Sequence, residues 1–218
     1  MLRLIKGGSD DEAGTGLAAG DEADTGPVPE FDRERDALGV SDLDFELPNA
    51  GTGPDPLSLA DLAAGPTDGV GRPAPRRETT PRNDAVVLFF QRDYHCRNCR
   101  EQVQAVADRY DEFRDRHAAV VSVLPESKAK AEKWQEKYHL PFALVADEDT
   151  RVADRYGQPV RFGALGKRID LAGRMPQVAI LDVRDDPQLY AVHRGDSPGD
   201  RPSVDDVLAM VDRMLADE

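Results

Sequence analysis

Cys96-Arg97-Asn98-Cys99 holds the only two cysteines of this 218-residue chain. The pair follows residues 84–90, Asp-Ala-Val-Val-Leu-Phe-Phe, an apolar run of strand length. It precedes residues 100–106, where apolar side chains begin to recur at helical spacing. A Cys-x-x-Cys pair between a buried strand and a helix is typical of thiol redox chemistry, because the unpaired N–H groups of the helix N-terminus stabilise the reactive thiolate.

The net charge of −14 is unevenly distributed along the chain. Residues 1–48 contain 13 acidic and 4 basic side chains, whereas residues 49–218 contain 29 and 24. Nucleic acids and anionic membranes need a basic binding surface, so we expect neither as a partner. No apolar run approaches twenty residues, and the first six residues are too short for a signal peptide, so we predict a cytoplasmic protein.

The composition predicts one folded domain with additional segments. Residues 1–40 are rich in Gly, Asp, Glu and Ala and poor in large apolar side chains, which predicts a disordered acidic tail. Such a tail keeps the protein solvated or serves as a docking arm. The folded domain is expected over residues 41–218, interrupted by an inserted loop rich in Pro, Gly and Arg at residues 65–83.

Strands and helices are expected to alternate along the domain. We predict short strands at 45–49 and 57–62 (the second leading into a helical turn), strands at 84–91, 118–124, 141–146, 176–182 and 188–193, and helices from the cysteine pair to about 117, at 126–138, at 147–156 and from Ser203 onward. This order predicts an α/β fold with a central mixed sheet, helices on both faces and a closing antiparallel hairpin. The cysteine pair then lies at the carboxyl end of a strand, where such sheets bind ligands.

Over about residues 42–218 the chain resembles the thioredoxin superfamily, and within it the AhpC/TSA (peroxiredoxin) group. The similar segments are Phe45-Glu-Leu-Pro-Asn49, Leu57-Ser-Leu-Ala-Asp-Leu62, Val86-Val-Leu-Phe-Phe90 leading into the cysteine pair, Trp134-Gln-Glu-Lys-Tyr-His-Leu-Pro-Phe142 and Val152-Ala-Asp-Arg-Tyr-Gly157. The resemblance implies a thioredoxin-like fold with an N-terminal β-hairpin extension. Met175-Pro176 resembles the cis-proline loop of thioredoxins. This resemblance implies that Pro176 is cis and lies close to the cysteines.

The chain departs from the group's usual Pro-x-x-x-Thr-x-x-Cys pattern. Arg92 stands where the proline would be and Cys96 where the threonine would be, which leaves Cys99 in the peroxide-reacting position. The position of the group's active-site arginine is occupied by Met175, next to Arg174. The pattern resembles the branch whose members carry Cys-x-x-Cys.

Two polarities of the cysteine pair remain open. In a thioredoxin-type reaction Cys96 attacks a disulfide and Cys99 resolves the product, whereas in a peroxiredoxin-type reaction Cys99 attacks a peroxide and Cys96 resolves. Both reactions end in the Cys96–Cys99 disulfide. Both need a lowered thiol pKa, which we expect from the helix N-terminus together with Arg97 and Arg100.

Three further residues are candidates for supporting roles. Arg174 is a candidate for stabilising the thiolate or a bound peroxide, and Pro176 for positioning the substrate. His95 is either a proton donor or a surface histidine. A zinc site needs four ligands, and the chain offers no second paired-ligand motif beside the cysteines, so we expect no metal and no cofactor.

The sequence therefore predicts a thiol-dependent antioxidant enzyme that reduces peroxides. The alternatives are a thioredoxin-like protein thiol–disulfide oxidoreductase and a catalytically silent thioredoxin-fold binding module. The expected partners are a peroxide or disulfide substrate and a thioredoxin-like or low-molecular-weight thiol reductant. With no distant resolving cysteine, a monomer or a weak homodimer is expected.

Overall fold

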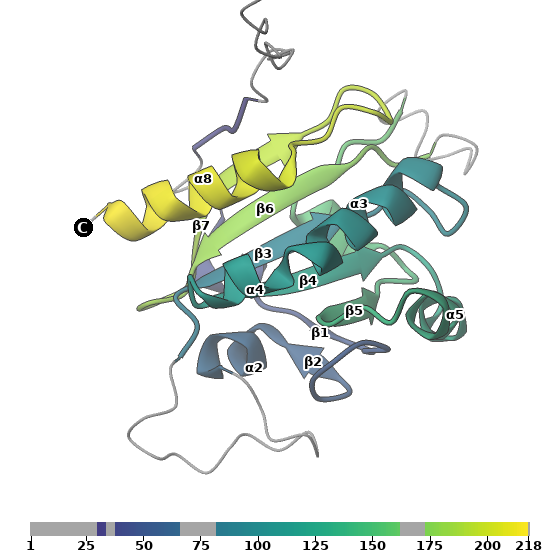
Figure 1. Ribbon diagram of the computed structural model, residues 1–218, viewed down its shortest axis with the longest axis horizontal. Coiled ribbons are helices and arrows are strands. Elements are labelled where there is room, and N and C mark those ends of the chain that lie inside the picture. Colours follow the sequence, from purple (N-terminus) through teal and green to yellow (C-terminus); the bar gives the residue numbers. More distant parts are fainter. Residues whose placement is uncertain (1–29, 34–37, 66–81, 162–172, 218) are drawn as a thin grey trace, which may run out of the picture.

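The structure is a computed structural model that describes residues 30–33, 38–65, 82–161 and 173–217 (Figure 1). A five-stranded sheet forms its centre and a two-stranded hairpin precedes it. The elements are α1 (Val40–Leu43), β1 (Glu46–Leu47), β2 (Leu57–Ser58), α2 (Leu59–Ala64), β3 (Ala85–Phe90), α3 (Arg97–Asp108), α4 (Tyr110–Arg114), β4 (Ala118–Leu124), α5 (Lys128–Tyr138), β5 (Ala143–Ala146), α6 (Arg151–Arg155), β6 (Gln177–Asp182), β7 (Gln188–Arg194) and α8 (Val204–Ala216).

The central sheet is mixed, with the strand order β5-β4-β3-β6-β7. Strands β3, β4 and β5 run parallel to one another, whereas β6 is antiparallel to both β3 and β7. Strand β3 lies in the middle and all six of its residues are buried, as its unbroken apolar sequence requires. The predicted α/β fold with a central mixed sheet and an N-terminal β-hairpin is therefore confirmed.

Two apolar layers pack on opposite faces of the sheet, because successive side chains of a strand point to opposite sides. Ala85, Val87 and Phe89 of β3 belong to the layer formed with α3, α4, α5 and α8. Their neighbours Val86 and Leu88 belong to the layer formed with α1, α2, α6 and the β1–β2 hairpin. Figure 1 shows α3, α4 and α8 lying across one face of the sheet, so the helix that carries both cysteines packs against β3 and β4.

The prediction of one helix from the cysteine pair to about residue 117 is wrong in one respect, because the structure has two helices there, α3 and α4. Arg109 leaves the helical conformation (φ −119°, ψ 21°) between α3 and α4. Its guanidinium bonds to Glu112, at the start of α4, and to Asp205 of α8. The Glu112 contact is local and the Asp205 contact is tertiary; both accompany the break, and an apolar period read from the sequence registers neither.

Part of the predicted acidic tail is placed on the sheet. Residues 1–29 and 34–37 lie outside the described residues. Asp32 exchanges two backbone hydrogen bonds with Val192 of β7 (2.8 and 2.9 Å), and the ring of Phe31 lies 5.8 Å from that of His193. Residues 30–33 therefore lie along β7, because the free edge of that strand pairs with their backbone. The predicted insertion at 65–83 falls mostly on residues 66–81, outside the described residues.

The cis bond expected at Pro176 is not present. Within the described residues, the cis peptide bond is Asp55–Pro56. The backbone on both sides of the Met175–Pro176 bond is already paired: Met175 N–H donates to the Pro159 carbonyl (2.8 Å), and the Pro176 carbonyl accepts from Gly195 N–H (2.9 Å). These bonds carry the chain in an extended course directly into β6.

Across the described parts of the chain, no helix is both long and apolar enough to span a membrane.

Candidate redox site

The two cysteines occupy the first turn of α3, directly after the loop that follows β3. Cys96 is the N-cap of the helix and its Sγ accepts the Cys99 N–H (3.1 Å). The two residues are joined by a disulfide with their Cα atoms 5.3 Å apart, within the ordinary range for this bond. The N-cap and the third helical residue lie on the same side of the first turn, so the disulfide forms while α3 remains intact.

Both sulfurs lie in the apolar layer between α3 and the sheet. Cys96 is 7% exposed and Cys99 is 0% exposed. Val103 and Val106, one and two turns further along α3, continue the same buried face. Solvent therefore reaches the pair on the Cys96 side, and Cys99 is the deeper sulfur.

Arg201 is the side chain that points its charge at the sulfurs. Its Nη2 lies 3.0 Å from Cys99 Sγ and 3.7 Å from Cys96 Sγ. The backbone N–H of Arg92 also donates to Cys99 Sγ (3.4 Å). Two donors therefore converge on Cys99, one of them cationic.

The sequence reasoning missed Arg201. It lies on the β7–α8 loop, which we define as Gly195–Pro202, and is separated from Cys99 by 102 positions. The available signal was that Arg201 is the only basic residue of this loop, which otherwise consists of Gly, Asp, Ser and Pro. That signal does not say where the side chain points.

Burial and a neighbouring cation disfavour the charge on Arg201. They lower the pKa of its guanidinium to about 10, through desolvation first and the positive charge of Arg92 second. Arg92 is held in place because its Nε donates to the Arg174 carbonyl (2.7 Å). A thiolate formed between these groups compensates the buried positive charge, so the site is electrostatically prepared for an anion.

Two of the sequence-predicted supporting residues are directed elsewhere. The Arg97 side chain is 82% exposed and its Nε pairs with Glu101 (2.7 Å), which raises the pKa of the guanidinium. His95 is exposed, its backbone N–H bonds to Asp93, and its ring meets the Tyr94 ring edge-on at 5.1 Å. Arg201 makes the contact with the sulfurs that was expected of Arg97.

Arg100, Arg174 and Pro176 lie around the site. The backbone N–H of Arg100 donates to the Cys96 carbonyl (3.3 Å) and closes the first turn of α3. Arg174 is 12% exposed, its Nη2 pairs with Asp154 (2.9 Å), and its carbonyl holds Arg92. The Pro176 carbonyl holds Gly195, where the β7–α8 loop begins. Arg174 and Pro176 thus support the two segments that supply donors to Cys99.

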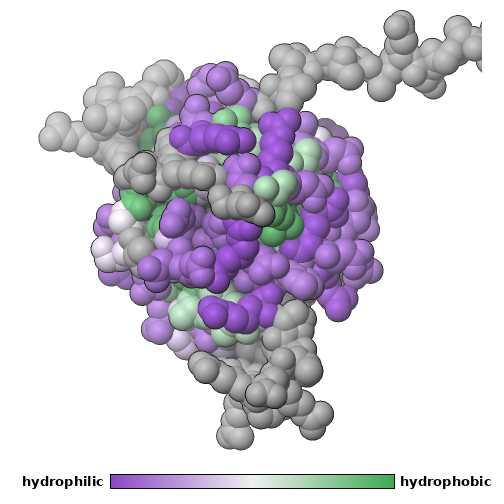
Figure 2. Space-filling model, turned by 90° about the vertical axis from the view of Figure 1, so that its left-hand side faces the viewer, coloured by the Kyte–Doolittle hydropathy of each residue, from purple (hydrophilic) through white to green (hydrophobic). Residues whose placement is uncertain are grey.

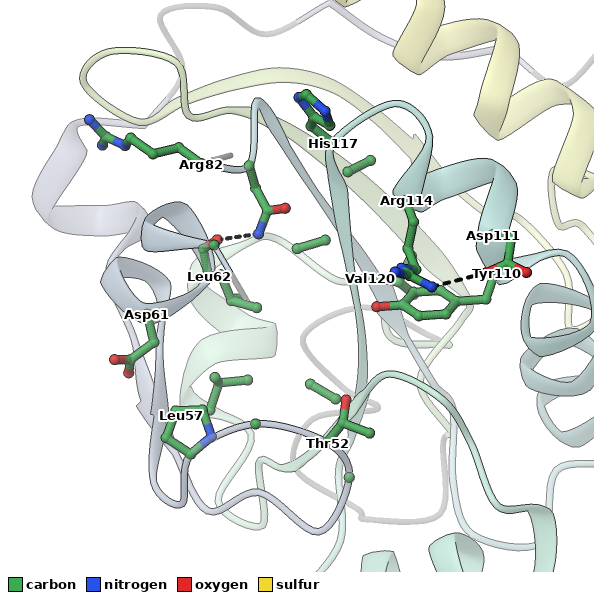
Figure 3. Close-up of a pocket in the computed structure, with 18 of the residues that line it drawn as sticks. Thr52, Leu57, Asp61, Leu62, Arg82, Tyr110, Asp111, Arg114, His117 and Val120 are labelled. Atoms are coloured by element: carbon green, nitrogen blue, oxygen red, sulfur yellow. Dashed lines mark hydrogen bonds and ion pairs between the residues drawn. The ribbon is translucent and has the colours of Figure 1, made fainter. Parts of the chain in front are cut away.

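A hollow of about 790 Å³ lies at the other end of the molecule. Tyr110 and Arg114 of α4 face Leu57 and Leu62 across it, beside the start of β4 at Ala118 (Figure 3). The cysteine pair follows the end of β3, which is parallel to β4, so the hollow is at the opposite edge of the sheet.

Figure 2, from the left-hand side of Figure 1, shows a mainly hydrophilic face with small hydrophobic areas. Within the described residues, no three His, Cys, Asp or Glu side chains gather as metal ligands.

Residues 43–182 match the AhpC/TSA family, which is more than half of the chain. The chain belongs to the AhpC/TSA family. It is 30% identical over 99 residues to the chloroplastic peroxiredoxin Q of Oryza sativa subsp. japonica, covering 44% of this chain and 42% of the relative. It is 30% identical over 125 residues to that of Sedum lineare, covering 57% and 62%. The match therefore spans less than two thirds of the length of these relatives.

Solved structures share the fold of this AhpC/TSA family member. Peroxidoxin BcpB from Mycobacterium tuberculosis has 22% identity and a TM-score of 0.58, covering 86% of this chain and 99% of that chain. Peroxiredoxin Q from Xanthomonas campestris has 16% identity and a TM-score of 0.59, covering 81% and 94%. The thioredoxin-like, peroxiredoxin-type fold expected from the sequence is therefore confirmed.

Proposed function

We propose that this AhpC/TSA family member is a thiol-dependent peroxidase in which Cys99 attacks the peroxide and Cys96 resolves the product. Family membership supports the reaction class. The observation that carries the assignment is the contact of Arg201 Nη2 with Cys99 Sγ at 3.0 Å, which is shorter than its contact with Cys96 Sγ. A cation at this distance favours the thiolate of Cys99 over its thiol.

The proposed reaction moves two electrons from the thiols to the peroxide. The Cys99 thiolate attacks the terminal peroxide oxygen, the O–O bond breaks, and the leaving alkoxide takes up a proton to become the alcohol. Cys99 is then a sulfenic acid. The Cys96 thiolate attacks this sulfur, the S–O bond breaks, and the released hydroxide takes up a proton to become water. The product is the Cys96–Cys99 disulfide that the structure contains.

The disulfide is then returned to two thiols by an external thiol. A thioredoxin-type dithiol or a low-molecular-weight thiol attacks one sulfur and releases the other as a thiolate. Cys96 is the sulfur that solvent reaches, so we expect the attack there, with Cys99 as the leaving thiolate beside Arg201. We further propose that the protein acts in the cytoplasm. We also propose that it acts as a monomer or weak homodimer, because the resolving Cys96 is in the same helix turn as Cys99.

Mass spectrometry after one equivalent of peroxide tests the polarity. In Cys96→Ser the sulfenic acid is expected on Cys99 and is trapped there by a sulfenic-acid reagent. Cys99→Ser is expected to lose peroxide consumption, because its remaining thiol lacks the closest cation. A sulfenic acid that forms on Cys96 but not on Cys99 overturns the assignment.

A thioredoxin-like disulfide oxidoreductase is the second candidate. It is favoured by the N-cap position of Cys96, whose Sγ accepts the Cys99 N–H (3.1 Å) and is the more exposed sulfur. In that case Cys96→Ser abolishes the reduction of insulin disulfides, while Cys99→Ser accumulates a mixed disulfide. If the two thiols do not oxidise and reduce reversibly, both enzymatic proposals fail and a silent binding module remains.

A further inference from the structure

Besides the contacts with the sulfurs, two hydrogen bonds tie the β7–α8 loop to the helix that carries the cysteines, and a third lies within the loop. Asn98 Nδ2 donates to the Pro198 carbonyl (3.1 Å), and Arg201 Nε donates to the same carbonyl (3.2 Å). Arg201 Nη1 donates to Gln102 Oε1. A carbonyl oxygen has two lone pairs, so it accepts both donors at once. Asn98 and Arg201 are thus joined through one oxygen atom, although they are separated by 103 positions in the printed sequence.

These contacts define the direction of the guanidinium. The planar fork of Arg201 has Nε on the Pro198 carbonyl and Nη1 on the Gln102 amide, which leaves Nη2 directed at Cys99 Sγ (3.0 Å). The fork is rigid, so fixing two of its nitrogens fixes the third. Loss of the Pro198 contact leaves Gln102 as the remaining anchor of the fork, so the guanidinium is less firmly directed at the sulfur.

The position of Asn98 makes it suited to hold the loop. It is half-buried, it lies between the two cysteines, and Gly199 lies close enough that a Cβ there would be 3.7 Å from Asn98 Nδ2. Within the described residues, the Asn98 amide bonds to the Pro198 carbonyl and makes no hydrogen bond to either sulfur. Any effect of Asn98 on the chemistry therefore passes through the loop.

We infer that Asn98 is a positioning residue that sets Arg201 on the Cys99 sulfur. Its amide holds the Pro198 carbonyl, which orients the guanidinium. The part of this inference that concerns peroxide turnover rests on the proposed peroxidase function. The part that concerns the state of the Cys99 thiol does not.

The pH profile of Cys99 alkylation tests the inference directly. In a Cys96→Ser background, the rate of reaction with iodoacetamide is followed against pH for Asn98→Ala and for Asn98→Leu, which keeps the side-chain volume. One net hydrogen bond corresponds to about a fivefold change in an equilibrium constant, so the thiolate fraction at neutral pH is expected to fall about fivefold in both. Gln104→Ala is the matched control, because this exposed amide of α3 bonds only locally to the Arg100 carbonyl (2.7 Å).

A double-mutant cycle separates positioning from a general structural effect. Arg201→Gln alone is expected to move the alkylation profile further than Asn98→Ala. Adding Asn98→Ala to Arg201→Gln is expected to move it no further, because the two residues act through one contact. Additive effects, an unchanged profile in either Asn98 variant, or an equal shift in Gln104→Ala overturn the inference.

Peroxide consumption measured on the Asn98 variants with both cysteines intact separates this inference from the proposed function. If the intact protein consumes no peroxide while the alkylation profile still shifts, the peroxidase proposal fails and the positioning role stands. If the intact protein consumes peroxide while the profile does not shift, the positioning role fails and the peroxidase proposal stands.

Discussion

Arg201→Gln is the substitution that most directly tests the electrostatics of the site. It removes a cation whose Nη2 lies 3.0 Å from Cys99 Sγ and leaves a neutral amide. A cation this close to a buried thiol lowers the thiol pKa by about 1–3 units. We therefore expect the pKa of Cys99 to rise in the variant, which lowers the thiolate fraction at neutral pH by up to about 100-fold.

The expected loss in rate is smaller than the loss of thiolate. A thiolate of higher pKa is a stronger nucleophile, with a Brønsted coefficient of about 0.4–0.5, so about half of the logarithmic loss is recovered. The second-order rate with peroxide at neutral pH is therefore expected to fall about tenfold. At high pH, where Cys99 is fully ionised in both the wild type and the variant, the variant is expected to react as fast as the wild type or faster.

Stopped-flow kinetics across the pH range measure this effect, with the thiolate followed by its ultraviolet absorbance. Arg97→Gln is the matched control, because Arg97 is a neighbouring arginine of the same motif that is 82% exposed and paired with Glu101. An exposed pair of this kind contributes little, so the control is expected to be close to wild type. An Arg97→Gln effect as large as that of Arg201→Gln, or no shift of the Cys99 profile in Arg201→Gln, refutes the reasoning.

Three further substitutions test the support of the site and the core. Gly195→Ala places a Cβ 2.5 Å from the Asp200 carbonyl oxygen, so the β7–α8 loop must shift; stopped-flow peroxide rates are expected to fall, and a rate equal to wild type would show that the loop adapts without moving Arg201. Tyr156→Phe removes the hydroxyl that donates to the Leu43 carbonyl (2.6 Å) in the core, and urea unfolding is expected to show a loss of about 1–3 kcal/mol, because a buried acceptor is left unpaired. Burial raises the pKa of Asp147 above 3.8, although hydrogen bonds from the Val152 and Ala153 N–H groups oppose the shift. The stability that the protonated Asp147 contributes is therefore present below pH 3.8 and is lost as pH rises through the folded-state pKa. The difference in free energy of unfolding between the wild type and Asp147→Asn is therefore expected to shrink as pH rises from 3.8, and a difference that grows would contradict this sign.

Much of the fold was predictable because its signals are local. The unbroken apolar run of β3 indicates a strand buried on both faces, and the structure buries all six residues. The sequence predicts the last helix from Ser203 onward, and Ser203 is its N-cap and forms a capping box with Asp206. The break at Arg109 was not predictable in the same way, because contacts with Glu112 and with Asp205, 96 positions away, accompany it.

The sequence alone determined that two cysteines lie in the first turn of a helix after a buried strand, since strand period, helix period and spacing are properties of neighbouring residues. It did not determine which arginine serves them. Arg97 is adjacent to Cys96, but a helix turns by about 100° per residue. Arg97 is therefore rotated about 200° around the helix from Cys99, which places it on nearly the opposite face and in solvent. Only the tertiary structure brings the β7–α8 loop over α3, where Asn98 and Gln102 direct Arg201 to the sulfur of Cys99.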